Sequence, residues 1–204
     1  MSGAGYNSLM DKLFRDVEGE TIAPQGSVVC IGAFDGLHRG HQALVGHVRA
    51  RARALGLKAV ALSFEPLPRE YFAPADPPAR LLLPRARFEG LCGLGMDVVG
   101  LLRFNAAMAA MSPETFVEKV LVQRLAAREV WVGPGFRFGH RRAGDLATLQ
   151  ALGATHGFKA GEVAVVADGQ ERVSASAVRA QLAAGDLEAA ARRPGPAVCY
   201  RRHR

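Results

Sequence analysis

The chain has 204 residues and a formal net charge of +7, and 49% of its residues are hydrophobic. That length supports one domain with a full core, and no apolar run approaches the ~20 residues of a membrane-spanning helix. Five arginines in residues 192–204 carry most of the positive charge. The remainder is close to neutral, so we expect a protein that binds neither nucleic acid nor membrane. Because the first residues lack a signal peptide and the three cysteines are isolated, we also expect a cytoplasmic location.

The first half of the chain predicts alternating strands and helices. Residues 27–31 form a short apolar run ending at Gly32, which is typical of a buried strand. Residues 39–55 have apolar side chains at helical spacing and end before Gly56, and residues 58–64 form a second apolar strand. This strand–helix–strand unit predicts parallel pairing. A loop rich in proline and arginine at 66–80 and a helix at 86–94 follow.

The second half continues the alternation. It predicts strands at 97–104, 129–132 and 159–166, and helices at 112–125, 145–156 and 176–185. Ser112 and Pro113 are typical of a capped helix start. The whole pattern indicates a single α/β domain over residues 1–191 with a Rossmann-like, doubly wound parallel sheet. Residues 192–204 have no apolar period, and we expect them to be disordered.

The segment after the first strand has the composition of an anion site. It reads Gly32-Ala-Phe-Asp-Gly-Leu-His-Arg-Gly-His41, and it lies where a parallel sheet places its ligands. Its glycines permit tight turns, and the following helix start offers free N–H groups and a positive dipole end. His38 and His41 are three residues apart, so both imidazoles can face one side of the first turn and donate to phosphate oxygens.

The residues of this segment do not favour three other interpretations. A single histidine near a helix start is usually a solvated or structural group, but a pair in this setting is much less often so. A metal site is not indicated, because no third histidine or cysteine stands nearby. A P-loop is excluded because the segment has no Gly-Lys-Ser/Thr.

The segment resembles the HxGH phosphate-binding signature of the nucleotidyltransferases, in the form typical of the FMN adenylyltransferase module of bacterial FAD synthases. Three further segments resemble motifs of that family and follow its order. They are Ser63-Phe-Glu-Pro-Leu-Pro-Arg-Glu-Tyr-Phe72, Val132-Gly-Pro-Gly-Phe-Arg-Phe-Gly-His-Arg-Arg-Ala-Gly-Asp145 and Val173-Ser-Ala-Ser-Ala-Val-Arg179. The resemblance runs from about residue 20 to residue 191.

The resemblance implies adenylyl transfer from ATP to FMN, with Mg²⁺ arriving on the nucleotide and no metal held by protein ligands alone. It implies catalytic roles for His38, His41 and Arg179. It assigns ATP to Gly32, Phe34, Asp35, Gly40, Gly133, Phe136, Phe138, Ser174 and Ser176, and FMN to Phe64, Glu65, Pro66 and Arg69. In this assignment Phe136 and Phe138 lie against the adenine.

Two alternatives stay open. The acceptor in place of FMN can be another phosphate, such as phosphopantetheine or nicotinate mononucleotide. The protein can also bind nucleotide or flavin with weak or no turnover, because Leu67 replaces the family's usual histidine and Gly135 its usual Asp or Asn. The resemblance further implies a riboflavin kinase module after the transferase. We expect that module to be absent here and a separate kinase to supply FMN.

Overall fold

A computed structural model describes residues 12–164 of the chain. Their core is a six-stranded parallel sheet in the order β1-β4-β3-β2-β5-β6. The strands are β1 (Leu13–Phe14), β2 (Ser27–Ile31), β3 (Lys58–Glu65), β4 (Val98–Arg103), β5 (Ala127–Val132) and β6 (Lys159–Glu162). The strand order reverses at β2, which pairs with both β3 and β5. The predicted α/β class and parallel sheet are confirmed.

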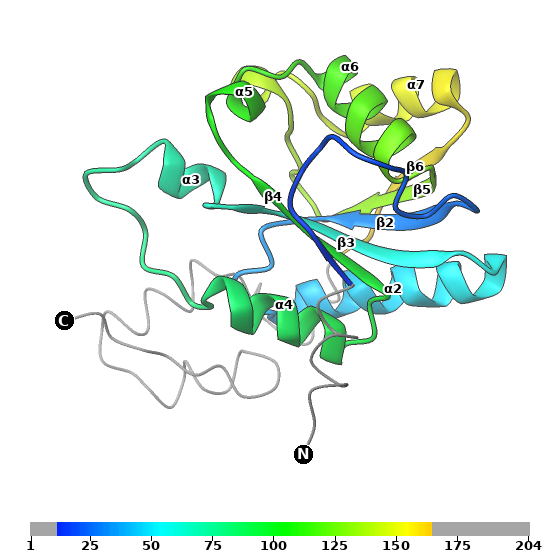
Figure 1. Cartoon of the computed structure of the whole chain (residues 1–204), viewed down its shortest axis with the longest axis horizontal. Coiled ribbons are helices and arrows are strands. Elements are labelled where there is room, and N and C mark those ends of the chain that lie inside the picture. Colours follow the sequence, from blue (N-terminus) through cyan, green and yellow to red (C-terminus); the bar gives the residue numbers. More distant parts are fainter. Residues whose placement is uncertain (1–11, 165–204) are drawn as a thin grey trace.

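Helices cover both faces of the sheet (Figure 1). One face carries α2 (Arg39–Leu55) and α4 (Pro84–Gly93). The other carries α5 (Ala106–Ala109), α6 (Pro113–Phe116) with the π-helix η1 (Val117–Arg124), and α7 (Leu146–His156). The short α3 (Pro68–Tyr71) and the 3₁₀ turn η2 (His140–Arg142) lie in the loops after β3 and β5.

The central strand explains why the fold needs two helical layers. All five residues of β2 are buried, as expected for a strand covered on both faces. Val28 and Cys30 pack into the core beneath α2 and α4, whereas Val29 and Ile31 pack into the core beneath α6 and α7. Successive side chains of a strand point to opposite faces, so one apolar run supplies both cores.

The long elements occur where the sequence predicts them. Gly56 ends α2 in a left-handed conformation at φ 65°, and Asp145 caps α7 through the backbone N–H of Thr148. Ser112 caps α6 as predicted. The helix predicted at 112–125 differs in that it continues as a π-helix, where the Leu125 N–H bonds to the Val120 carbonyl. An apolar pattern does not distinguish that wider turn from an α-helix.

The elements that the sequence missed are all short. They are β1, α3, α5 and η2, which have two to four residues each and are too short to show a period. The last strand ends at Glu162 rather than near Val166. The predicted helix at 176–185 and the tail at 192–204 lie outside the described residues. Within residues 12–164 no helix has the length and apolarity to cross a membrane.

Candidate active site

The histidine loop, residues 32–41, leaves β2 at the point where the strand order reverses and leads into α2. Phe34, Gly36 and Leu37 have φ values of 50°, 90° and 41°. Such angles cost about 1–3 kcal/mol for non-glycine residues and persist only where the surroundings impose them. The φ of Gly36 favours glycine, and an added Cβ would also lie 2.9 Å from Leu81 Cδ1, so that the leucine side chain would have to shift. The surrounding residues therefore hold the histidine loop in one conformation.

Asp35 imposes much of that shape. Its carboxylate is 1% exposed, and Oδ1 accepts the backbone N–H groups of Leu81 and Leu82 at 3.0 and 2.8 Å. Its Oδ2 lies 2.5 Å from Arg69 Nη2. Asp35, predicted to bind ATP, thus ties the histidine loop to the segment before α4. Arg69, predicted to bind FMN, forms an ion pair with Asp35 in this structure.

The two imidazoles stack at the start of α2. Their ring centroids are 3.7 Å apart with planes 20° from parallel. His38 is the N-cap, and its Nδ1 accepts the backbone N–H of His41 at 3.4 Å. Because Nδ1 is an acceptor, a neutral His38 carries its proton on Nε2, where it is a donor for a ligand. The structure thus brings the two predicted catalytic histidines together.

Burial favours the neutral form of both imidazoles. It lowers the pKa of His38, an effect that the charge of Asp35 opposes. It lowers the pKa of His41 well below its ordinary value of 6.5, and repulsion from His38 adds to the effect. His41 Nδ1 is buried and has no hydrogen-bond partner in the structure. A buried unpaired ring nitrogen is costly unless a ligand satisfies it.

The remaining predicted residues of the loop shape its packing. Phe34 is fully buried, with its ring centroid 5.2 Å from that of His41. A Cβ at Gly32 would lie 3.2 Å from the Phe34 ring, and a Cβ at Gly40 would lie 3.2 Å from the His38 ring. Both glycines therefore allow the aromatic rings to stand where they do.

Arg87, which the sequence analysis missed, joins the histidine loop to the end of β3. Its side chain is 1% exposed, with Nη1 donating to the Ala33 carbonyl at 3.2 Å. Nη2 donates to the Phe64 carbonyl at 2.9 Å and to Glu65 Oε2 at 2.7 Å. The sequence feature that could have identified Arg87 is its position on α4, four residues before the buried Leu91. Residues four apart lie on the same face of a helix. A cation on an apolar helix face is rarely buried without partners.

Arg80 extends this network over the loop after β3. It pairs with Glu65 at 2.6 Å and with Glu70 at 2.6 Å. Glu70 Oε2 also accepts the backbone N–H of Leu67, whose side chain is 1% exposed. Glu65, predicted to bind FMN, is thus paired with Arg80 in this structure, and Leu67 is buried at the N-terminus of α3. Pro66 follows Glu65 through a cis peptide bond.

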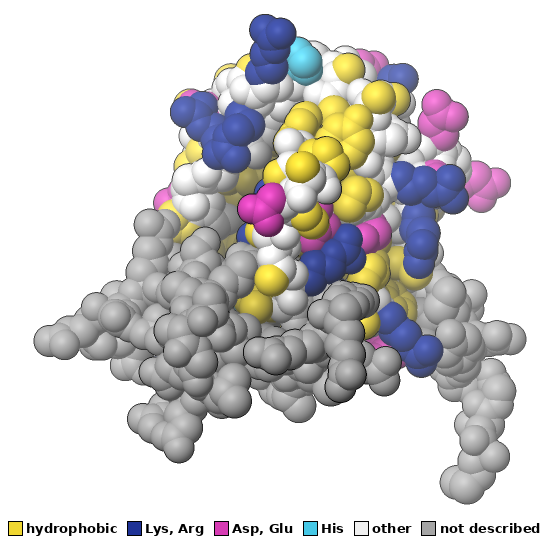
Figure 2. Space-filling view, turned by 90° about the vertical axis from the view of Figure 1, so that its left-hand side faces the viewer, with side chains coloured by type: hydrophobic (Ala, Val, Ile, Leu, Met, Phe, Trp, Pro, Cys, Tyr) yellow, Lys and Arg dark blue, Asp and Glu magenta, His cyan; other side chains and the backbone are white. Residues whose placement is uncertain are grey.

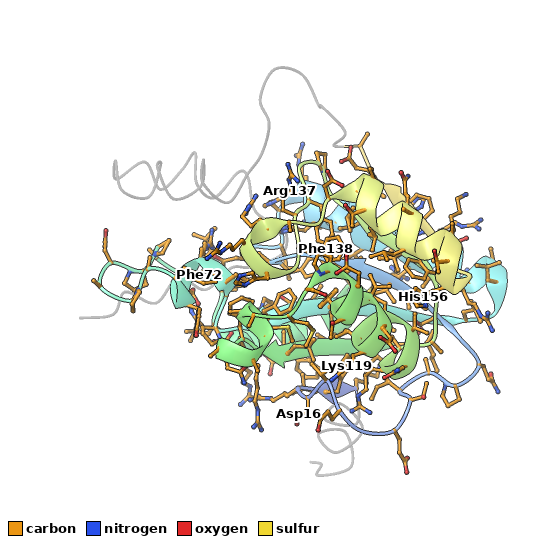
Figure 3. The ribbon with its side chains drawn as sticks, turned by 90° about the horizontal axis from the view of Figure 1, so that it is seen from above. Asp16, Phe72, Lys119, Arg137, Phe138 and His156 are labelled. Carbon is orange, nitrogen blue, oxygen red and sulfur yellow. The ribbon has the colours of Figure 1, made fainter. Side chains whose placement is uncertain are left out.

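An aromatic cavity of about 340 Å³ lies on the α5–α6 side of the sheet, near the same edge. Phe64 and Phe116 meet at a centroid distance of 6.3 Å, and Phe136 stacks on Phe138 at 5.4 Å. Phe72 is 67% exposed at the margin, on the α3 side of the labelled Phe138 (Figure 3). The lining is completed by Ile31, Pro68, Phe104, Met108, Ala109, Met111, Arg137, Gly139, Arg141 and Arg142.

This cavity divides the predicted residues differently from the sequence assignment. Phe136 and Phe138, predicted to bind ATP, line it together with Phe64, predicted to bind FMN. Gly133 and Gly135 lie in the preceding turn, where an added Cβ would meet nothing within 4 Å, although Gly135 has φ 74°. Ser174, Ser176 and Arg179 lie outside the described residues. Among residues 12–164 no group of three or more His, Cys, Asp or Glu is arranged to hold a metal.

The end of the molecule that carries α3 shows hydrophobic side chains gathered between groups of lysine and arginine (Figure 2). A larger hollow of about 800 Å³ lies elsewhere, between the C-terminal half of α2 and the residues before β4. Arg49, Arg53 and Asp97 line it, with small side chains between them. It contains neither histidine of the pair and no aromatic ring. The chemistry therefore favours the edge that holds the histidine loop and the aromatic cavity.

Comparison with known proteins identifies relatives of this chain. The family model for FAD synthetase matches residues 20–177. A bifunctional riboflavin kinase/FMN adenylyltransferase of Pseudomonas fluorescens is 43% identical over 169 residues, which are 82% of this chain and 54% of that protein. The protein of the same description from Escherichia coli K12 is 38% identical over 177 residues, 86% of this chain and 56% of its own. The chain thus spans about half the length of these curated relatives.

A solved structure supports the fold alone. A crystal structure described as a macrolide-efflux protein from Streptococcus pneumoniae matches with a TM-score of 0.75 at 23% identity. The match covers 88% of this chain and 58% of that one. The family model covers most of this chain, including the histidine loop and every described residue of the cavity. The chain belongs to the FAD synthetase family.

Proposed function

We propose that the protein transfers the adenylyl group of ATP to the phosphate of FMN, producing FAD and pyrophosphate. The observation that carries this proposal is that two parts of a site, here named half-sites, lie at the sheet edge where the strand order reverses. A stacked histidine pair at the start of α2 lies on one face, and an aromatic cavity lies on the other. A reaction between a nucleotide and a ring-bearing phosphate needs both.

The ATP phosphates are assigned to the histidine loop and the N-terminus of α2. His38 Nε2 and the unpaired His41 ring are suited to donate to phosphate oxygens, and the helix dipole adds to the attraction. Ser174, Ser176 and Arg179 remain the predicted clamp on the β and γ phosphates. Mg²⁺ enters as part of the MgATP substrate, because Mg²⁺ is usually held by phosphates with few carboxylates.

FMN is assigned to the aromatic cavity, with its phosphate directed toward the histidine loop. This moves Phe136 and Phe138 from the adenine to the flavin side and leaves Gly133 near the adenine. The cavity is at the lower end of the usual ~300–1,000 Å³ range, which suits a ring system rather than a whole dinucleotide. Arg69 is one-third exposed and its Nε has no partner, so it is placed to exchange part of its contact with Asp35 for the FMN phosphate.

The reaction needs no nucleophile from the protein. A phosphate oxygen of FMN attacks the α-phosphorus of ATP, and the bond from that phosphorus to the α–β bridging oxygen breaks. Pyrophosphate leaves with the bonding electron pair. The imidazole donors stabilise its charge, and the Mg²⁺ of the MgATP substrate would add to this stabilisation. The contribution of the protein is alignment and electrostatic stabilisation of charge.

The test is to incubate the protein with FMN and MgATP and to follow FAD and pyrophosphate by chromatography. His41→Asn is expected to lower kcat/KM by about 10²–10³-fold, the usual cost of losing one donor to transition-state charge. His47→Asn, on the same helix but outside both half-sites, is the matched control and retains activity. If no FAD is formed while the protein still binds ATP, the result would favour a binding protein without turnover. Transfer to a different phosphate acceptor would favour the other alternative.

The source of FMN is a separate step in this proposal. Every residue assigned above serves adenylyl transfer, and a separate riboflavin kinase is proposed to supply FMN. Riboflavin with MgATP in the same chromatographic assay tests this, and formation of FMN would contradict it. The cytoplasmic location stays a prediction.

A further inference from the structure

Three arginines stand at the mouth of the aromatic cavity. Arg137, Arg141 and Arg142, here named the arginine rim, line the cavity and are exposed to solvent. Arg137 lies 3.5 Å from Asp145, a distance typical of a weak ion pair. Within residues 12–164, the guanidinium groups of Arg141 and Arg142 make neither a hydrogen bond nor an ion pair. The rim thus presents donors that the described part of the protein does not use.

The backbone holds this rim in an unusual conformation. Arg141 and Arg142 have φ values of 51° and 60°, a region that L side chains rarely adopt. The turn is fixed on both sides, because Phe138 and Gly144 pair as a bridge and the His140 N–H bonds to the Met111 carbonyl at 2.7 Å. Non-glycine residues held in this way cluster at ligand sites, where the surrounding structure imposes the strain.

The floor of the cavity has the opposite character. Phe64, Phe116, Met108 and the stacked pair Phe136 and Phe138 offer apolar surface without hydrogen-bond donors. A ligand that fills the space must therefore be apolar at its inner end and carry acceptors at its outer end. Arginine supplies only donors, five on each planar group, and is suited to carbonyl oxygens and ring nitrogens.

We propose that the arginine rim binds the carbonyl-bearing edge of the flavin ring, while its dimethylbenzene edge lies on the aromatic floor. The isoalloxazine ring has this polarity, with acceptors O2, N1, O4 and N5 at one end and two methyl groups at the other. The rim then determines specificity, because it strengthens the binding of flavins and not of aromatic tricycles that lack the carbonyl edge. This inference rests on the proposed function, which places FMN in the cavity.

The position of the arginine rim indicates that it binds the flavin ring and not the FMN phosphate. The rim packs toward α5 and α6, through the contact of His140 with the Ala109 carbonyl and of Gly139 with Pro113. The histidine loop leads into α2 on the opposite face of the sheet (Figure 1). A phosphate that reacts beside the histidines is directed away from the rim, which leaves the ring as its partner.

The test compares the double variant Arg141→Gln/Arg142→Gln with Arg141→Lys/Arg142→Lys and with Arg128→Gln, an exposed arginine outside the cavity. Dissociation constants are measured by fluorescence titration for FMN, for riboflavin, which has no phosphate, and for neutral acridine at pH 8, which has no carbonyl group. The glutamine variant is expected to bind FMN and riboflavin about tenfold more weakly and by equal factors, with acridine binding unchanged. The lysine variant recovers part of the loss.

Kinetics give an independent readout. Loss of a contact that is equal in ground and transition states raises KM for FMN and leaves kcat unchanged. Weakening of FMN binding alone would show that the rim holds the phosphate, and equal weakening of acridine would show that it only shapes the cavity. Either result, or no change, overturns the inference while the wild type still makes FAD. Failure of the wild type to bind any flavin overturns the proposed function itself.

Discussion

Replacing Arg87 by methionine removes the side chain that joins the histidine loop to the end of β3. The change deletes the bonds to the carbonyls of Ala33 and Phe64 and to the Glu65 carboxylate. Breaking a buried ion pair costs about 3–5 kcal/mol. Glu65 is 23% exposed and keeps its pairing with Arg80, so the lower end, about 3 kcal/mol, is expected. For a chain of this size that lowers the melting temperature by about 6–12 °C.

Arg87→Lys separates charge from geometry. A lysine keeps the charge but cannot direct two nitrogens at the two strand ends, so about half of the stability loss is expected. The assay is thermal and urea unfolding, with Arg85→Met as the control, because Arg85 is 72% exposed and its pair with Glu89 contributes little. If the lysine variant folds, its kcat for FAD formation falls while each substrate's Kd stays within about twofold. An Arg87→Met protein within about 0.5 kcal/mol of wild type would refute the reasoning.

Three further predictions concern stability. Burial lowers the pKa of His41 below 6.5, so the folded state binds fewer protons than the unfolded state. Stability is therefore lost as pH falls below about 6.5, and His41→Asn should flatten that part of a melting-temperature profile. Asp35→Ala leaves two buried backbone N–H groups without an acceptor and costs about 2–5 kcal/mol in urea unfolding, whereas Asp35→Asn retains an acceptor and costs less than half as much. Gly46→Ala, on the exposed face of α2 with nothing within 4 Å, should stabilise by about 0.5–1 kcal/mol. Gly153→Ala, in α7, should destabilise instead, because its Cβ would lie 2.6 Å from the Phe158 carbonyl oxygen; equal effects of the two alanines would contradict this.

Much of the fold was predictable because the local spacing of apolar residues indicates the long strands and helices. The buried strand β2 has four consecutive apolar residues, and the capped helices α2 and α7 have patterns longer than one turn. The histidine pair was predictable for the same reason, since a helix start brings residues three apart onto one side. The π-helical turn before Leu125 and the short α3 and α5 depend on contacts across the core, which no local pattern contains.

The candidate site likewise has some features that local sequence predicts and others that depend on contacts across the fold. The sequence by itself determined the histidine loop, the parallel sheet behind it and the family, because these depend on neighbouring residues and on ordered motifs. Only the tertiary structure placed Phe136 and Phe138 beside Phe64, paired Asp35 with Arg69 and set Arg87 between two strand ends. These partners lie far apart in the chain, and their distances depend on strand order and on the faces to which the loops turn. A residue's chemical type is local, but its partner is decided by the packing of the whole domain.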